Sequence, residues 1–512
     1  MSGNKTIVKN SLILYIKLIS SSIIGLLTAS FILQALGASN FGLYSVVGDI
    51  VFMMAFLNNV MISTTYRFVA FEMGRNEPNG INKVLNISMV IHLGLAFLTV
   101  LLAETIGLFY IRNYLNVPID KIADAVFVFR LSILSTVFAI ISVPFQGLIV
   151  AKEKFLITSS VELMRSVLGL FVVFLVYNYT GNRLRLYAVL IASITIISPI
   201  LYFFYARHHY SNLIKWRLQK DKTKYKEMVG FSGWIMLGAG ASAAEIQVSA
   251  ILINLFFGTV VNAAFGIANQ VKNVVLMFAQ SLNQAAIPQI TKSFSGGDTD
   301  RTIQIVIFTS KYSFYLMLLP ALPLLLETKF ILQLWLSNVP EYTVTFVQII
   351  IINALIATMN AGIPAIIQAT GKIKYFQIFL STISVLALPS SYILFKMGYE
   401  PIVMTLTFTI AAILNLVVLQ VLLKYLIKFD IKEFILKAYW KMIIVVIPLL
   451  SLFFVKLFIT EGFGRFIGLS GLSIISLFIL IYVLGMENSE KVLISNQIKQ
   501  TNMYKHINVV KL

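Results

Sequence analysis

Residues 207–226 read RHHYSNLIKWRLQKDKTKYK and separate two long apolar parts of the chain. The stretch carries seven lysines and arginines, and Asp221 is its only acid. Positive charge beside segments that can span a bilayer is typical of loops that stay in the cytosol. We therefore interpret residues 207–229 as a basic cytosolic linker between two halves of a membrane protein.

The composition supports this interpretation. Of the 512 residues, 58% are hydrophobic and 12% are charged, whereas a soluble domain carries about 25% charged residues. Apolar runs of about 18 residues or more, long enough to cross a bilayer as helices, recur throughout. The net charge of +19 lies mostly in short loops beside these runs, where lysine and arginine orient helices and contact anionic lipid. We therefore expect membrane lipids, and no nucleic acid, as partners.

The apolar runs predict an all-α polytopic membrane protein with about 14 transmembrane helices. The expected spans are residues 10–36, 41–68, 82–110, 122–150, 155–178, 184–206, 230–256, 260–291, 302–326, 343–370, 374–397, 401–427, 438–459 and 464–485. Very short gaps such as 37–40 and 257–259 predict tight antiparallel hairpins. Lysine and arginine concentrate on one side of this topology, which predicts that both termini are cytosolic.

An internal duplication is visible in the spacing of prolines and lysines. The pattern Pro144, Lys152, Lys154 recurs with the same spacing at Pro364, Lys372, Lys374. An even number of helices separates the two copies, which predicts two parallel six-helix repeats with the substrate path at their interface. The expected parts are an N-terminal lobe, the linker, a C-terminal lobe, two additional helices and a cytosolic tail, at residues 1–206, 207–229, 230–428, 429–485 and 486–512.

The eighth expected span carries a stripe of amides. Asn262, Asn269, Asn273, Gln280 and Gln284 follow one another at intervals of seven and four, which places them on one face of a helix. Lipid offers such groups no hydrogen-bond partner. The stripe therefore either bonds neighbouring helices or lines a water-filled cavity. Asp49, Asn59 and Ser63 form a matching stripe on the second span, which favours the cavity.

Charged side chains inside spans are the other candidates, because a charge at mid-membrane costs about 2.5–3.5 kcal/mol on insertion scales. The deep cations are Lys272, Arg130 and Lys311. Lys17 either snorkels to the inner surface or joins the cavity, and Arg67 is either an anchor or a ligand. Asp49 and Glu245 would neutralise lysines or bind a coupling cation, H+ or Na+. Glu162 and Arg165, three residues apart, are expected to pair with each other.

Motifs for catalysis are absent from the sequence. No Gly-rich phosphate loop ends in Gly-Lys-Ser/Thr, and no metal-ligand cluster occurs. The chain also has no cysteine, which excludes disulfides and thiol chemistry. We therefore expect no enzyme activity, no cofactor and no metal.

The whole chain resembles the superfamily of MATE exporters, MurJ-type lipid II flippases and Wzx-type polysaccharide (O-antigen) flippases. The resemblance rests on the two six-helix halves, the turns at residues 37–40 and 258–261, the paired proline and lysine elements, and the run LGASNFGLY at 36–44. It is closest to the Wzx-type flippases, because drug exporters generally have twelve helices and flippases about fourteen. The resemblance implies that the first, second, seventh and eighth helices line a central cavity.

These observations lead to one functional hypothesis and two alternatives. The hypothesis is a flippase for a polyprenyl-pyrophosphate-linked oligosaccharide, in the cytoplasmic membrane of a bacterium, that acts by alternating access and works alongside other polysaccharide-assembly proteins. The expected cavity residues are Lys17, Arg67, Lys272, Asn59, Asn269, Asn273, Gln280 and Gln284, with Arg130 and Lys311 as additional charges. The alternatives are a cation-coupled MATE-type drug exporter and a membrane-embedded glycosyltransferase or polymerase.

Overall fold

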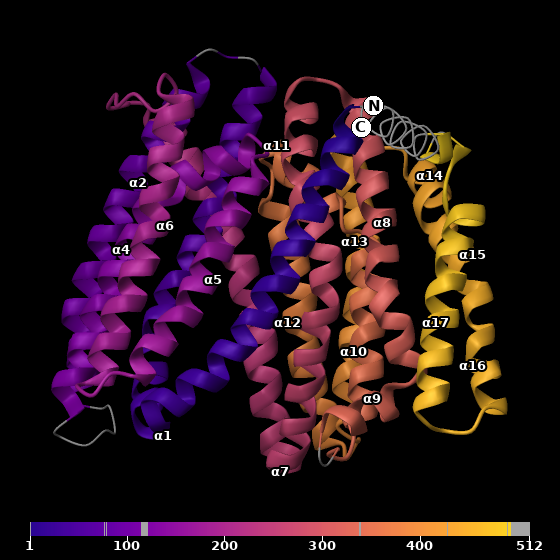
Figure 1. Cartoon of the computed structure of the whole chain (residues 1–512). Helices are drawn as coiled ribbons and strands as arrows, with labels where there is room; N and C mark the ends of the chain where they lie inside the picture. The colour runs from indigo at the N-terminus through magenta and orange to yellow at the C-terminus, as the bar shows by residue number, and fades with distance from the viewer. Residues whose placement is uncertain are drawn as a thin grey trace, which may run out of the picture. The chain divides into compact units, whose positions relative to one another are not determined.

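The computed structural model describes the backbone of residues 2–75, 77, 79–113, 121–336, 339–427, 429–488 and 490–492 (Figure 1). Side-chain surroundings are described for most of these residues, but not for 2–9, 45–60 and scattered positions such as 22–23, 26–27 and 38–39. Asp49 and Asn59 therefore lie outside the described side chains. Helices account for nearly all of the described secondary structure, and no strand occurs among these residues. The all-α prediction is confirmed.

The chain divides into two compact units. The first comprises residues 1–241, 284–305 and 365–381, and the second comprises 242–283, 306–364 and 382–512. These units differ from the two expected lobes, because short segments of the later half belong to the first unit. The repeat and its lobe boundaries stay predictions.

The first unit is built mainly from the early helices. They are α1 (Ser2–Arg75), α2 (Gly80–Leu102), η1 (Ala103–Gly107), α3 (Leu108–Asn113), α4 (Ile122–Ala151), α5 (Phe155–Tyr177) and α6 (Arg183–Tyr210). α1 packs against α4 and α5, and α4 packs against α6, which runs beside it in Figure 1. Both ends of α7 (Lys222–Ser295) belong to this unit as well. Buried apolar side chains such as Phe129 and Ile111 form its core.

The second unit holds the middle of α7 and most of the later helices. They are α8 (Thr299–Leu326), α9 (Thr328–Trp335), α10 (Thr343–Thr358), α11 (Ile363–Thr370), α12 (Lys374–Lys396), α13 (Ile402–Ile427), α14 (Ile431–Phe434), η3 (Ile435–Tyr439), α15 (Trp440–Leu449), α16 (Ser451–Val455), η4 (Lys456–Phe458), α17 (Phe463–Leu480) and η5 (Ile481–Gly485). The beginning of α8, most of α11 and the beginning of α12 belong to the first unit. α10 packs against α13, and α15 packs against α17.

Two glycines break the two longest helices. Gly37 in α1 has φ 74° and ψ 160°, and Gly258 in α7 has φ 79° and ψ −175°. Both conformations lie in a region that favours glycine because a side chain would collide with the backbone. These are the positions at which the sequence predicts tight turns, so each of the two helices consists of two expected spans joined at a glycine.

The described residues contain 10 helices that are long and apolar enough to span a membrane, or 11 if the bent pair α10 and α11 counts as one span. The expected spans 10–36, 41–68 and 260–291 are helical parts of α1 and α7 but are not in that number. The protein is therefore a multi-span membrane protein, and the count of 14 is approximate.

Candidate functional site

The predicted amide stripe lies on the second half of α7. Asn273, Gln280 and Gln284 are exposed, and Asn269 is half-buried. The Asn269 amide donates to the carbonyl of Phe265 on the same helix at 3.1 Å. The interhelical hydrogen bonds found among the described residues do not include the amides of Asn273, Gln280 and Gln284. These side chains are therefore available to a ligand or to water.

Lys272 lies beside this stripe and is half-buried, as is Glu245 in the first half of α7. The break at Gly258 folds α7 back on itself, and the charges of Lys272 and Glu245 interact. The salt bridges found within 4.0 Å among the described residues do not include this pair. The negative charge of Glu245 therefore acts on Lys272, although the pair is not among the salt bridges of the described residues.

Lys17 in α1 forms a salt bridge with Glu162 in α5. The expected partner of Glu162 was Arg165 on the same helix, and that expectation is wrong, because the carboxylate turns to the lysine of the neighbouring helix. Lys17 is about one-quarter exposed and Glu162 somewhat more. In this conformation the ammonium group of Lys17 is already neutralised.

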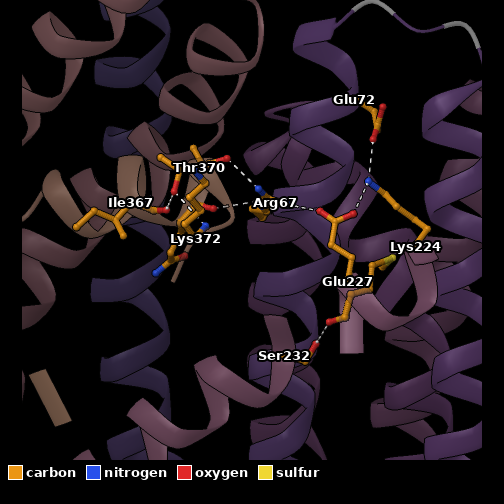
Figure 2. A network of polar contacts seen from close by, with 11 residues as sticks. Arg67, Glu72, Lys224, Glu227, Ser232, Ile367, Thr370 and Lys372 are labelled. Carbon is orange, nitrogen blue, oxygen red and sulfur yellow. Dashed lines mark hydrogen bonds and ion pairs between the residues drawn. The ribbon is translucent and has the colours of Figure 1, made fainter. Parts of the chain in front are cut away.

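Arg67 lies at the centre of a polar network (Figure 2). Its side chain is 4% exposed. Nε and Nη2 donate to the carbonyl oxygens of Gln368 and Ala369 at 3.0 and 2.8 Å, at the end of α11. On the other side, Nη1 lies 3.9 Å from Glu227 Oε1. The guanidinium therefore caps the C-terminal carbonyls of a helix, where positive charge is favourable.

Lys224 extends this network away from Arg67. Its Nζ lies 3.1 Å from Glu227 Oε2 and 3.3 Å from Glu72 Oε1 (Figure 2). The aromatic rings of Phe68, Phe71 and Phe231 surround the guanidinium carbon of Arg67 at 4.4, 5.0 and 5.0 Å. The network thus joins the end of the expected second span to the beginning of α7 and the end of α11.

The two additional cations have different surroundings. Arg130 in α4 is about half exposed and forms a salt bridge of 2.9 Å with Glu104 in η1. Lys311 in α8 is buried, and its Nζ lies 2.7 Å from Glu490, just beyond η5. Each cation that the sequence nominated, where its side chain is described, therefore has an acidic group in contact or nearby. No cluster of histidine and acidic residues among the residues described here could hold a metal ion.

Sequence reasoning missed a second network, around Glu153 in the turn between α4 and α5. Glu153 Oε1 lies 2.5 Å from Lys292 Nζ, and its Oε2 accepts from Gln289 Nε2 at 2.5 Å. Glu153 has φ 59°, which is uncommon for a residue other than glycine. Burial and the charge of Lys292 lower the pKa of the neighbouring Lys152. In the sequence, Glu153 is only an acid between Lys152 and Lys154, and this pattern does not predict the network.

Comparisons with known proteins bear on this architecture. A family model described as "Polysaccharide biosynthesis protein" matches residues 7–294. No curated protein matches the chain. A crystal structure of a MATE mutant has a TM-score of 0.72 at 13% identity, with 83% of this chain and 97% of that chain covered.

Two further structures have the same coverage, 83% of this chain and 97% of the other. One is an outward-facing multidrug resistance MATE family transporter of the MOP superfamily, with a TM-score of 0.70 at 12% identity. The other is a MOP superfamily transporter from Pyrococcus furiosus, with a TM-score of 0.67 at 12% identity. At such low identity these likenesses show the fold, whereas the family model covers more than half of the chain. The chain therefore belongs to the polysaccharide biosynthesis protein family, and it has the fold of the MATE transporters.

Proposed function

We propose that this membrane transporter flips a polyprenyl-pyrophosphate-linked oligosaccharide across the cytoplasmic membrane for cell-envelope polysaccharide synthesis. The observation that carries the proposal is the exposed amide stripe on α7 beside Lys272. Amides supply both donors and acceptors for sugar hydroxyls, and a lysine is a common phosphate ligand. The family match supports a glycan-related cargo.

The head group would enter the site with its pyrophosphate toward Lys272 and its sugars along Asn269, Asn273, Gln280 and Gln284. Polar side chains within spans face a protein interior or water-filled space, whereas the polyprenyl tail gains by staying in lipid. Lys17, Arg67, Arg130 and Lys311 would join such a site only after leaving the acidic or carbonyl partners that they contact here.

The orientation follows from the basic residues. Lys152, Lys154, Lys292, Lys372 and Lys374 lie in loops or at helix ends of the first unit. The positive-inside rule favours a cytosolic position for such loops, and we propose cytosolic termini on this basis. An inside-negative potential would then drive an anion outward by about 2.3 kcal/mol per charge per 100 mV.

A cation-coupled drug exporter is the second candidate, and Glu245 favours it. Glu245 is a half-buried acid in α7 that could bind H+ or Na+. Binding would neutralise its carboxylate, so that the carboxylate would no longer attract the ammonium group of Lys272. The same event could instead couple a cation to the oligosaccharide cargo. We propose no enzyme activity, and the fold shared with structures described as MATE transporters supports this.

Reconstitution into liposomes tests the cargo. The probe is a synthetic polyprenyl pyrophosphate disaccharide with a fluorophore on the sugar, and a membrane-impermeant reductant quenches the molecules in the outer leaflet. We expect the protein to increase the quenched fraction of this probe, and to act less on a polyprenyl glycoside that lacks pyrophosphate. Transport of a cationic dye in a cation gradient, with no flipping of the lipid probe, would favour the drug exporter.

The amide stripe gives a specific prediction. The double variant Asn273→Ala/Gln280→Ala should flip the disaccharide probe about tenfold more slowly, because each lost hydrogen bond is worth about 0.5–1.5 kcal/mol. Folding should be unaffected, since both side chains are exposed. Asn178→Ala is the control, because it removes an exposed amide at the end of α5. Equal rates for the stripe variant and the control would contradict the role of the stripe.

A further inference from the structure

Two polar contacts in the first unit join residues from opposite halves of the chain. In the first, Arg67 at the end of the expected second span holds the carbonyls of Gln368 and Ala369. In the second, Gln289 and Lys292 at the end of α7 hold Glu153. In each contact, the end of a long helix from one half of the chain binds a turn from the other half. The two contacts therefore have the same arrangement with the halves exchanged.

The turn that receives Arg67 is shaped for this contact. Gly371 has φ +78°, and a Cβ placed on it would lie 2.8 Å from Arg67 Nη2. Thr370 closes the end of α11, because its hydroxyl accepts from the backbone N–H of Lys372 at 3.1 Å (Figure 2). The backbone conformation therefore favours glycine at this position, and a larger residue would displace the guanidinium beside it.

The ends of α1 and α7 also meet closely, at Gly74 and Ser295. A Cβ placed on Gly74 would collide with the hydroxyl of Ser295 and the carbonyl oxygen of Lys292, and would lie 2.9 Å from Ser295 Cβ. Backbone packed this closely leaves no space for a larger residue, and the obstacle includes backbone that cannot rotate away.

We propose that these contacts form the inner gate of the transporter. The gate comprises the Arg67 contact with the α11 carbonyls, the Glu153 contact with Gln289 and Lys292, and the Gly74 contact with Ser295. It is closed in this structure, and its contacts must break together when the path opens on this side. The proposal rests on transport by alternating access, but not on the identity of the cargo.

The chemistry of the contacts suits a gate that opens and closes. Hydrogen bonds and ion pairs exchange for water at modest net free energy, whereas a large apolar interface would not. Arg67 also keeps an acidic neighbour in Glu227, 3.9 Å away. When the α11 carbonyls withdraw, the guanidinium can remain paired with Glu227 and need not be left as an isolated buried charge.

Labelling of a single cysteine tests the gate, because the native chain has none. Gln284→Cys is the reporter: it lies eight positions before Lys292 on α7, about 12 Å along the helix. A membrane-impermeant maleimide is applied to inverted vesicles, which expose the proposed cytosolic side. We expect slow labelling in the reporter protein and about tenfold faster labelling when Glu153→Gln is added, since hydrogen bonds to charged groups are among the strong ones.

Three further variants sharpen the test. Gly74→Val should wedge the helix ends apart and also accelerate labelling, whereas Gly94→Val in α2 should not, because a Cβ there meets nothing within 4 Å. The exchange Glu153→Lys/Lys292→Glu should slow the labelling again, because it restores a pair of opposite charges. If Gly74→Val does not fold, the charge variants decide the outcome.

The proposed gate would be overturned if the Glu153→Gln and Gly74→Val proteins folded and were labelled as slowly as the Gly94→Val control. The assay needs no cargo, so it separates the gate from the proposed function. Faster labelling together with no flipping of the disaccharide probe would leave the gate in place and reject the cargo.

Discussion

Glu490→Ala should destabilise the folded protein more than Lys311→Met, although both remove the same ion pair. Lys311 is 1% exposed, whereas Glu490 is 18% exposed. Losing Glu490 leaves a buried ammonium without its partner, which costs about 3–5 kcal/mol. Lys311→Met removes the buried charge and keeps an apolar chain in its place. Glu490 then remains partly hydrated, and its Oε2 still accepts from the backbone N–H of Glu487 at 2.8 Å.

Thermal unfolding in detergent, with the yield of folded protein from membranes, measures this difference. The double variant Lys311→Met/Glu490→Gln should recover most of the lost stability, because neither charge is then left alone. Lys437→Ala is the control, because its pair with Glu433 is exposed and such pairs contribute about 0.3–0.5 kcal/mol. If Lys311 instead serves the cargo, Glu490→Ala will leave stability unchanged and Lys311→Met will slow flipping.

The sequence was sufficient for features that follow from local chemistry. Hydrophobic runs of bilayer length predicted the helices, because backbone groups in lipid must be satisfied within the helix. Gly37 and Gly258 lay at the predicted turns, where only a few residues separate two apolar runs, and both adopt positive φ. Within one helix, the regular spacing of Asn273, Gln280 and Gln284 predicts a shared face, and their role in a cavity stays a prediction.

Partners between helices could not be predicted in the same way. Glu162 has Arg165 three positions away, yet it pairs with Lys17, because the packing of α1 on α5 brings that ammonium closer. Lys311 and Glu490 are 179 positions apart, and no periodicity connects them. The role of Glu153 depends on a backbone conformation with φ 59°, and the neighbouring residues in the sequence do not predict this conformation.

Lys272→Glu should abolish flipping of the disaccharide probe. The substitution places a second acid near Glu245, where the charges of residues 245 and 272 already interact, and it repels a pyrophosphate. Two unit charges about 4 Å apart interact by about 4 kcal/mol at an effective dielectric constant of about 20, which corresponds to about a thousandfold in affinity. Lys272→Arg should retain much of the rate, because the positive charge survives.

Lys272→Ala separates a substrate role from a structural one. If Lys272 serves the cargo, this variant should keep its expression and thermal stability while flipping falls, because the salt bridges among the described residues include none between Lys272 and Glu245. If the lysine instead neutralises Glu245 for folding, Lys272→Ala should lower the yield of folded protein and Glu245→Gln should restore it. Both outcomes are measured on protein from the same membranes. Thermal unfolding gives the stability, and the liposome assay gives the flipping rate. Normal flipping by a well-folded Lys272→Glu protein would remove this residue from the site, and with it the main chemical reason for an anionic cargo.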